Sequence, residues 1–124
     1  MKAVLDSSVL IDAIHGRVEA RLYLDSLQTG SGMYSAVSLS ELLAGTGDAE
    51  YERSLEVFLS PFQFCDVTDP VARQAGALRR EYGARGLALT DALIAATALV
   101  HDAVLVTRDR AHFQIDGLRV ESPA

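Results

Sequence analysis

Short apolar stretches that alternate with helical patterns along the whole chain predict an α/β fold. The runs at 3–5 and 103–107 have the length and continuous hydrophobicity of strands buried on both faces. The segments between such runs show the apolar spacing of amphipathic helices. Strands joined by helices form βαβ units, so we expect a parallel sheet with helices on both faces.

The first elements are expected as a strand at 2–6, a helix that ends at Gly16, and a second helix at about 17–28. Val18 and Leu22 of the second helix are expected to face inward, with Leu24 and Leu27 as further candidates. The later elements are strands at 33–37, 63–67, 103–107 and 118–121, helices at 38–45, 48–59, 69–82 and 90–101, and a helical turn at 109–113.

The composition describes a globular protein and excludes several classes. The 124 residues, 49% hydrophobic and 23% charged, suit a single domain over residues 1–124. No apolar run approaches the roughly 20 residues that span a bilayer, and the N-terminus reaches a charge too soon for a signal peptide. The lone cysteine, Cys65, excludes an internal disulfide and a cysteine-based zinc cluster. We therefore expect a cytoplasmic protein with no membrane contact.

The net charge of −6 argues against passive binding of nucleic acid through a basic surface. Up to four of the acids can be metal ligands, however, and a bound cation would cancel part of the charge where a phosphate approaches. Arg108 and Arg110 also place positive charge on either side of Asp109. The charge therefore disfavours a pure binding module.

Four acidic residues that are distant in sequence are expected at one edge of the sheet. Asp6 follows the first strand and Asp109 follows the strand at 103–107, whereas Glu41 and Asp91 lie near the starts of helices. If the two most apolar strands are adjacent, their carboxyl ends flank the crevice where open α/β sheets bind ligands. Carboxylates converging there would repel one another unless a hard divalent cation such as Mg²⁺ or Mn²⁺ held them together. The pattern predicts metal-assisted phosphodiester hydrolysis.

Asp6 and Glu41 also have purely structural explanations. Asp6 could cap the helix that follows it, although Ser7 or Ser8 could cap that helix instead. Glu41 stands three residues after Ser38, which is the spacing of a capping box. Both interpretations stay open at this point.

Asp91 and Asp109 have structural alternatives as well. Asp91 suits a first helical turn because of the helix dipole, yet it shares a helical face with Ile94, so its carboxylate is expected to point to a packed side. Asp109 could cap the short turn that follows it. Thr107 ends its strand beside Asp109, where its hydroxyl could position a water molecule or simply close the strand.

Taken together, the four acidic segments resemble the PIN-domain family, and within it the small VapC-type toxins of prokaryotic toxin–antitoxin pairs. The resemblance runs from Lys2 to about Val120. The segments that carry it are residues 4–11, 37–45, 89–98 and 106–113, in the order and at the spacing of the family.

The resemblance implies a PIN-like three-layer sandwich, a five-stranded parallel sheet flanked by helices on both faces. It implies an Mg²⁺- or Mn²⁺-dependent endoribonuclease. The implied metal ligands and catalytic residues are Asp6, Glu41, Asp91 and Asp109, and the supporting residues are Ser8 and Thr107. Many family members have asparagine where this chain has Arg108, which could contact an RNA phosphate, as could Arg110.

The resemblance also implies two protein partners. A VapB-type antitoxin would restrain the ribonuclease, with an arginine entering the acidic crevice and an apolar segment lying in a groove formed by residues 9–28 and 48–59. A homodimer is expected because the helix at 48–59 carries more apolar surface than one core can bury. The apolar residues concerned are Leu55, Val57, Phe58 and Leu59.

Two alternative functions stay open. One is a catalytically silent PIN-fold module that binds RNA or protein, and the other is a housekeeping metal nuclease without a toxin role. A phosphoacceptor receiver domain is disfavoured because it needs a late lysine and the only lysine is Lys2. The three histidines share no metal-ligand spacing, which disfavours zinc.

Overall fold

The computed structural model describes residues 1–45 and 47–123, and its strands form one sheet. The strands are β1 (Ala3–Leu5), β2 (Gly32–Ser35), β3 (Gln63–Cys65), β4 (Val104–Val106) and β5 (Val120–Glu121). They lie in the order β3-β2-β1-β4-β5, and each neighbouring pair is parallel. The expected five-stranded parallel sheet is confirmed, with β1 and β4 adjacent.

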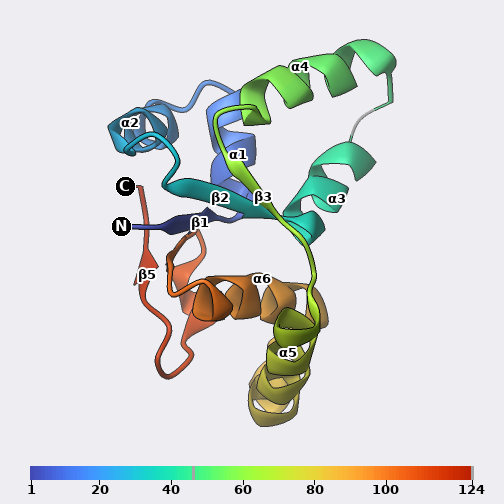
Figure 1. Ribbon diagram of the computed structural model, residues 1–124, viewed down its shortest axis with the longest axis vertical. Helices are drawn as coiled ribbons and strands as arrows, with labels where there is room; N and C mark the ends of the chain where they lie inside the picture. Colours follow the sequence, from blue (N-terminus) through green and yellow to red (C-terminus); the bar gives the residue numbers. More distant parts are fainter. Residues whose placement is uncertain (46, 124) are drawn as a thin grey trace.

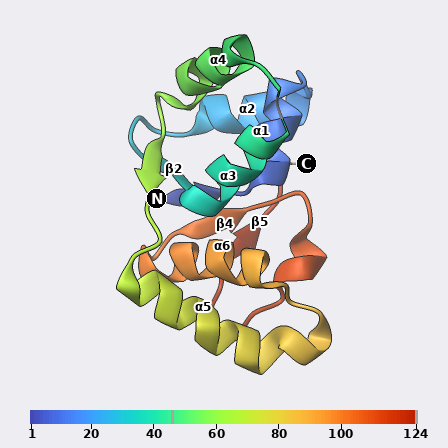
Figure 2. The same cartoon turned by 90° about the vertical axis from the view of Figure 1, so that its right-hand side faces the viewer.

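Helices cover both faces of this sheet. They are α1 (Ser7–Ile14), α2 (Val18–Ser26), α3 (Ala36–Ala44), α4 (Ala49–Leu59), α5 (Asp69–Tyr82) and α6 (Leu89–Val100), with short 3-10 turns η1 (Gly83–Arg85) and η2 (Arg110–Phe113). In Figure 1, α1 to α4 lie above the sheet and α5 and α6 below it, and Figure 2 shows the same three layers from the side. Among the described helices, none is both long enough and apolar enough to cross a membrane.

The sheet divides the hydrophobic core in two, because successive side chains of a strand point to opposite faces. Val4 of β1 and Leu105 of β4 pack in the cluster that contains α5 and α6. Leu5 and Val106 pack in the cluster beneath α1 to α4. None of the four side chains has measurable exposure, so both central strands are buried on both faces, as their continuous apolar runs predicted.

The chain changes direction across the sheet between β1 and β4. From β1 it runs outward to β2 and β3, and it then returns through α5 and α6 to β4 on the other side of β1. The amide of Asp6 donates to the carbonyl of Val106 at 2.9 Å, which extends the pairing past the strand ends. Asp6 and Thr107 therefore lie together at the carboxyl edge, where sheets of this kind bind ligands.

Helix α3 begins two residues before the expected position. Ser35 ends β2 and caps α3, because its hydroxyl oxygen accepts a hydrogen bond from the amide of Ser38 at 3.1 Å. Ser38 is therefore inside the helix, and Glu41 lies in the second turn. The capping-box interpretation of Ser38 and Glu41 is wrong, and the Glu41 side chain needs another explanation.

Helix α2 turns a different face to the core from the one expected. Val18 and Leu22 are each 63% exposed. The inward stripe consists instead of Ala20, Tyr23 and Leu24, which have the i, i+3, i+4 spacing of one helical face and pack against the upper cluster. The expectation is therefore wrong for Val18 and Leu22, which lie on the opposite side of the helix, and it is confirmed for Leu24 and Leu27, which pack against the core.

Helix α4 buries part of the apolar surface that predicted a dimer. Leu55 and Leu59 are buried in the core of this chain, and Phe58 is half-buried. Val57 is 74% exposed. Of the four apolar residues considered in the sequence, Val57 is thus the one left most accessible to a partner.

The orientation of α2 can be tested by comparing the same leucine-to-alanine substitution at a buried position of α1 and at an exposed position of α2. Leu10→Ala on α1 should lower the free energy of unfolding by about 2–5 kcal/mol, because Leu10 is fully buried and its loss leaves a cavity. Leu22→Ala on α2 should change it by less than about 0.5 kcal/mol. Urea unfolding of the purified chain measures both values. Equal losses for the two variants would contradict the orientation of α2.

Candidate active site

The carboxylate of Asp6 is held by three hydrogen bonds at the end of β1. Its Oδ1 accepts from the amide of Ser7 at 2.9 Å, and its Oδ2 accepts from the hydroxyls of Ser8 and Thr107, each at 2.8 Å. Asp6 is the N-cap of α1, so neither serine replaces it in that role. A carboxylate has about four acceptor positions, so capping leaves an acceptor position for a ligand.

Ser7 connects Glu41 to the same site. The amide of Ser7 donates to Asp6, and its hydroxyl donates to Glu41 Oε1 at 3.0 Å. Because Glu41 projects from the second turn of α3, this bond fixes α3 against the start of α1. This role of Ser7 was not predicted from the sequence, where its position directly after Asp6 is the only signal for it.

Two hydroxyl groups hold the segment after β4 against Asp6. The hydroxyl of Thr107 donates to Asp6 and accepts from the amide of Asp109 at 3.0 Å. The hydroxyl of Ser8 donates to Asp6 and accepts from the amide of Arg108 at 3.1 Å. Ser8 and Thr107 therefore position the backbone that carries Asp109, which gives their expected supporting roles a physical form.

Asp91, in the first turn of α6, is coupled to the site electrostatically. Burial raises the pKa of Asp91 above its ordinary value of 3.8, and the negative charge of Asp6 raises it further. His112 opposes this rise, and Asp109 adds to it. The negative charges of Asp6 and Asp109 therefore reach Asp91 through space, although it belongs to a different element from either of them.

The acidic side chains at this edge offer oxygen ligands for a metal ion but do not enclose one. Within residues 1–45 and 47–123, no three acidic, histidine or cysteine side chains lie close enough together to enclose a metal ion. The donors at this edge are carboxylate oxygens, which suit a hard divalent cation. Burial is the main cause of the raised pKa of Asp91, and a cation would relieve the part of the rise that comes from the charges of Asp6 and Asp109. The residues present fit such an ion by their chemistry.

Arg108 forms an ion pair with α1. Its Nη1 lies 2.6 Å from Oδ1 of Asp12, and Nε of Arg17 lies 3.4 Å from the same oxygen. Asp12 was not singled out in the sequence, yet it is buried and helps to fix the loop after β4. A phosphate contact of Arg108 or Arg110 stays a prediction, and Arg108 would have to share its charge with Asp12.

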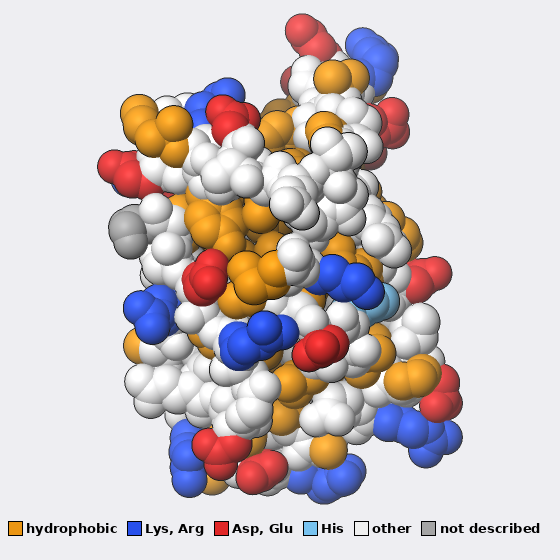
Figure 3. Space-filling model, turned by 60° about the vertical axis from the view of Figure 1, so that its left-hand side comes forward, with side chains coloured by type: hydrophobic (Ala, Val, Ile, Leu, Met, Phe, Trp, Pro, Cys, Tyr) orange, Lys and Arg blue, Asp and Glu red, His pale blue; other side chains and the backbone are white. Residues whose placement is uncertain are grey.

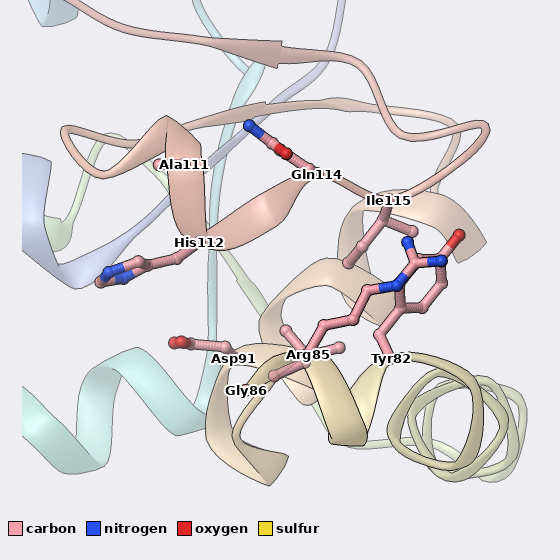
Figure 4. A pocket seen from close by; sticks show the side chains of 9 residues that line it. Tyr82, Arg85, Gly86, Asp91, Ala111, His112, Gln114 and Ile115 are labelled. Atoms are coloured by element: carbon pink, nitrogen blue, oxygen red, sulfur yellow. The ribbon is translucent and has the colours of Figure 1, made fainter.

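A cavity of about 260 Å³ adjoins the acidic residues. It lies between η1, the start of α6 and η2, and Asp91 is part of its wall. Figure 4 shows Asp91 and His112 at one end of this cavity and Tyr82 and Arg85 at the other. The candidate site therefore continues from the carboxylates into an adjacent hollow of mixed polarity.

The parallel sheet and the acidic residues at its carboxyl edge define a class of protein: the chain belongs to the PIN domain family, whose model matches residues 3–118. Ribonuclease VapC19 from Mycobacterium tuberculosis is 37% identical over 114 residues, which cover 89% of this chain and 90% of the relative. Ribonuclease VapC10 from the same species is 39% identical over 113 residues, covering 89% and 84%. The resemblance found in the sequence is confirmed.

Solved structures show the same likeness in three dimensions. A toxin–antitoxin complex from Klebsiella pneumoniae contains a chain with a TM-score of 0.84 and 31% identity, covering 99% of this chain and 98% of that one. VapBC2 from Rickettsia felis, bound to a DNA fragment from their promoter, gives a TM-score of 0.87 at 27% identity, with 98% of each chain covered. These values confirm the PIN-like three-layer sandwich over nearly the whole chain.

The coupling of Asp91 to the other acids predicts a pH-dependent stability. The folded-state pKa of Asp91 is raised above 3.8, so the folded protein holds this proton more tightly and loses stability as the pH rises through that pKa. In EDTA, Asp91→Asn should therefore raise Tm at neutral pH, and the gain should vanish below about pH 3.8. Calorimetric scans at several pH values measure this, and an equal gain at every pH would exclude charge as its cause.

Proposed function

We propose that this chain is an endoribonuclease of the VapC type and that the crevice at the carboxyl edge of β1 and β4 is its hydrolytic site. The observation that carries the proposal is the carboxylate of Asp6, which is only 6% exposed, held by three donors, and electrostatically coupled to Asp91. RNA as the substrate class is supported by the two M. tuberculosis relatives, both of which are ribonucleases by name.

We also propose that Asp6, Glu41, Asp91 and Asp109 hold Mg²⁺ or Mn²⁺. When bound there, such a cation supplies a water nucleophile of lowered pKa and neutralises charge on the scissile phosphate. The chain itself positions the metal ligands. The hydrogen bonds to Asp6 fix its carboxylate, and the Thr107 hydroxyl fixes the backbone of Asp109. Ser7 fixes the carboxylate of Glu41 beside them.

Metal-dependent cleavage is tested with the purified, partner-free chain. It should cut RNA with Mg²⁺ or Mn²⁺ and stop in EDTA. Asp6→Asn should lower the rate by roughly 100-fold or more, since even a residue that only supports a metal ligand contributes about 10- to 100-fold. Asparagine retains an acceptor for the Ser7 amide but loses the acceptor for the Ser8 and Thr107 hydroxyls. Removing one negative charge from the crevice offsets part of this loss, so Tm should fall only modestly and the variant should stay folded.

Asp25→Asn serves as the matched control, because Asp25 is an exposed acid on α2 outside the crevice. It should cut RNA like the parent chain. Equal cutting by the parent in EDTA would count against the metal mechanism. No cutting under any condition would favour the alternative of a silent binding module.

We propose a VapB-type antitoxin as the partner that restrains this activity, in the cytoplasm where RNA is present. Two cavities, of about 330 and 150 Å³, lie along α1, α2 and α4, and Arg21 and Phe58 line both. They fall within the groove expected from residues 9–28 and 48–59. On the face in Figure 3, hydrophobic side chains gather in the upper half. Val18 and Leu22 of α2 are exposed as well. An apolar segment suits it, and an arginine suits the acidic crevice.

We further propose that the partner-free chain is a homodimer. β3 is an edge strand, and Phe64 within it and Val67 just beyond it are 43% and 42% exposed. Beside this edge, a cavity of about 360 Å³ is lined by Tyr34, Leu39 and Phe64, among others. Apolar surface of this kind supports association with a second copy.

The toxin role is tested by expression. The chain alone should arrest bacterial growth, the Asp6→Asn variant should not, and co-expression of the neighbouring gene should restore growth to cells that make the parent chain. Protein levels and RNA cleavage by the purified chain serve as controls. A harmless chain that is folded and cuts RNA would remove the toxin role and favour a housekeeping metal nuclease.

A further inference from the structure

The cavity beside Asp91 shares this residue with the proposed hydrolytic site. Asp91 belongs to both, and His112, in η2, lies next to it at the same end of the cavity (Figure 4). A polymer whose scissile phosphate lies among the carboxylates must place a neighbouring nucleotide close by. The cavity is a hollow within reach of that nucleotide.

The walls of the cavity match a nucleobase better than a phosphate. Leu87 and Ile115 supply apolar surface, and the Gln114 amide, the His112 ring and the Arg85 guanidinium supply polar groups. A base has apolar faces and polar edges, and unpaired RNA bases are recognised by stacking together with hydrogen bonds to those edges. A phosphate in this space would meet the negative charge of Asp91 at one end.

Arg85 is held in place by an aromatic ring that is itself fixed. Its Cζ lies 5.4 Å from the centroid of the Tyr82 ring, which is within the range of a cation–π contact. Tyr82 is 6% exposed, and its hydroxyl accepts a hydrogen bond from the amide of Asp116 at 3.1 Å. The guanidinium therefore has a rigid support on one side.

The charge of Arg85 is also free to act on a ligand. Across residues 1–45 and 47–123, Arg85 has no ion-pair partner, whereas Arg108 is paired with Asp12. Gly86 follows in the left-handed conformation, with φ of 99°, and this tight turn leads through the buried Leu87 into α6 and Asp91. Arg85 and Asp91 therefore lie on one short segment that the buried Leu87 anchors in the core.

We infer that this cavity receives one unstacked RNA base next to the scissile phosphate, with Arg85 as the planar group on which the base stacks. The inference rests on the proposed ribonuclease activity, because it names a substrate subsite of that enzyme. Arg85 is thereby a specificity-determining residue, and Gln114 and His112 offer hydrogen bonds to the base edge. Through this subsite a protein with a net negative charge can bind RNA by a base, so it needs few contacts with the phosphates.

Binding without catalysis provides the first test. The ¹⁵N-labelled full-length chain in EDTA is titrated with AMP, GMP, CMP and UMP, and separately with ribose 5-phosphate. At least one nucleotide should shift the amide signals of Leu87, Ala111 and Gln114, and ribose 5-phosphate should not. Equal shifts with ribose 5-phosphate, or shifts confined to other regions, would overturn the base subsite.

Variants of Arg85 separate stacking from charge. Arg85→Ala should weaken nucleotide binding between about fivefold and about 150-fold, the range of one base-stacking contact. Arg85→Lys should weaken it nearly as much, because lysine keeps the charge and loses the plane. The control Arg80→Ala removes an exposed arginine of α5 outside the cavity and should leave binding unchanged. Binding by Arg85→Lys at the parent affinity would reject stacking.

Cleavage of a random-sequence RNA pool with Mg²⁺ or Mn²⁺, read by sequencing the new ends, provides the second test. The parent chain should prefer one base at a position flanking the cut, and Arg85→Ala should raise KM and weaken that preference while cutting continues. An unchanged preference would overturn the subsite and leave the nuclease standing. A pool that stays uncut while nucleotides still shift the cavity amides would instead remove the proposed function and retain the base-binding cavity.

Discussion

The hydrogen bond from the Thr107 hydroxyl to Asp6, 2.8 Å long, joins the ends of the two central strands, and the rest of the site is arranged around it. Parallel pairing of β1 with β4 places both residues at one edge, because the carboxyl ends of parallel strands coincide. The hydroxyl of Thr107 also accepts a hydrogen bond from the amide of Asp109. Ser7 donates its amide to Asp6 and its hydroxyl to Glu41. A single pairing of buried strands thus determines where three acidic side chains lie.

Local charge explains how a chain with net charge −6 can act on an anionic polymer. Burial raises the pKa of Asp91, and the negative charges of Asp6 and Asp109 raise it further, so the divalent cation that we propose would offset this repulsion where phosphate must approach. Arginines near the site are not equivalent. Arg108 is paired with Asp12 and helps to fix the loop after β4, whereas Arg85 lies over the Tyr82 ring and forms no ion pair with any residue that the structure describes.

The two sides of the sheet have different tasks. Helices α1, α2 and α4 carry apolar cavities and exposed Val18 and Leu22, which suit a protein partner. Helices α5 and α6, on the opposite face, form the cavity beside Asp91, which suits the substrate. Because the carboxylates lie at the edge between these layers, a partner on one side and RNA on the other can reach the same charges.

The sequence by itself determined the sheet and the acidic residues at its edge. Continuous apolar runs at β1 and β4 require burial on both faces, and Asp6 is covalently tied to the end of its strand. Tertiary structure decided the rest. The spacing of Ser38 and Glu41 suggested a capping box, but Ser35 is the residue that caps α3. The hydrogen-bond partner of Glu41 is Ser7, which comes from a distant segment of the chain. The faces of α2, the ion pair of Arg108 with Asp12 and the contact of Arg85 with Tyr82 also arise only when separate elements pack, which local spacing cannot report.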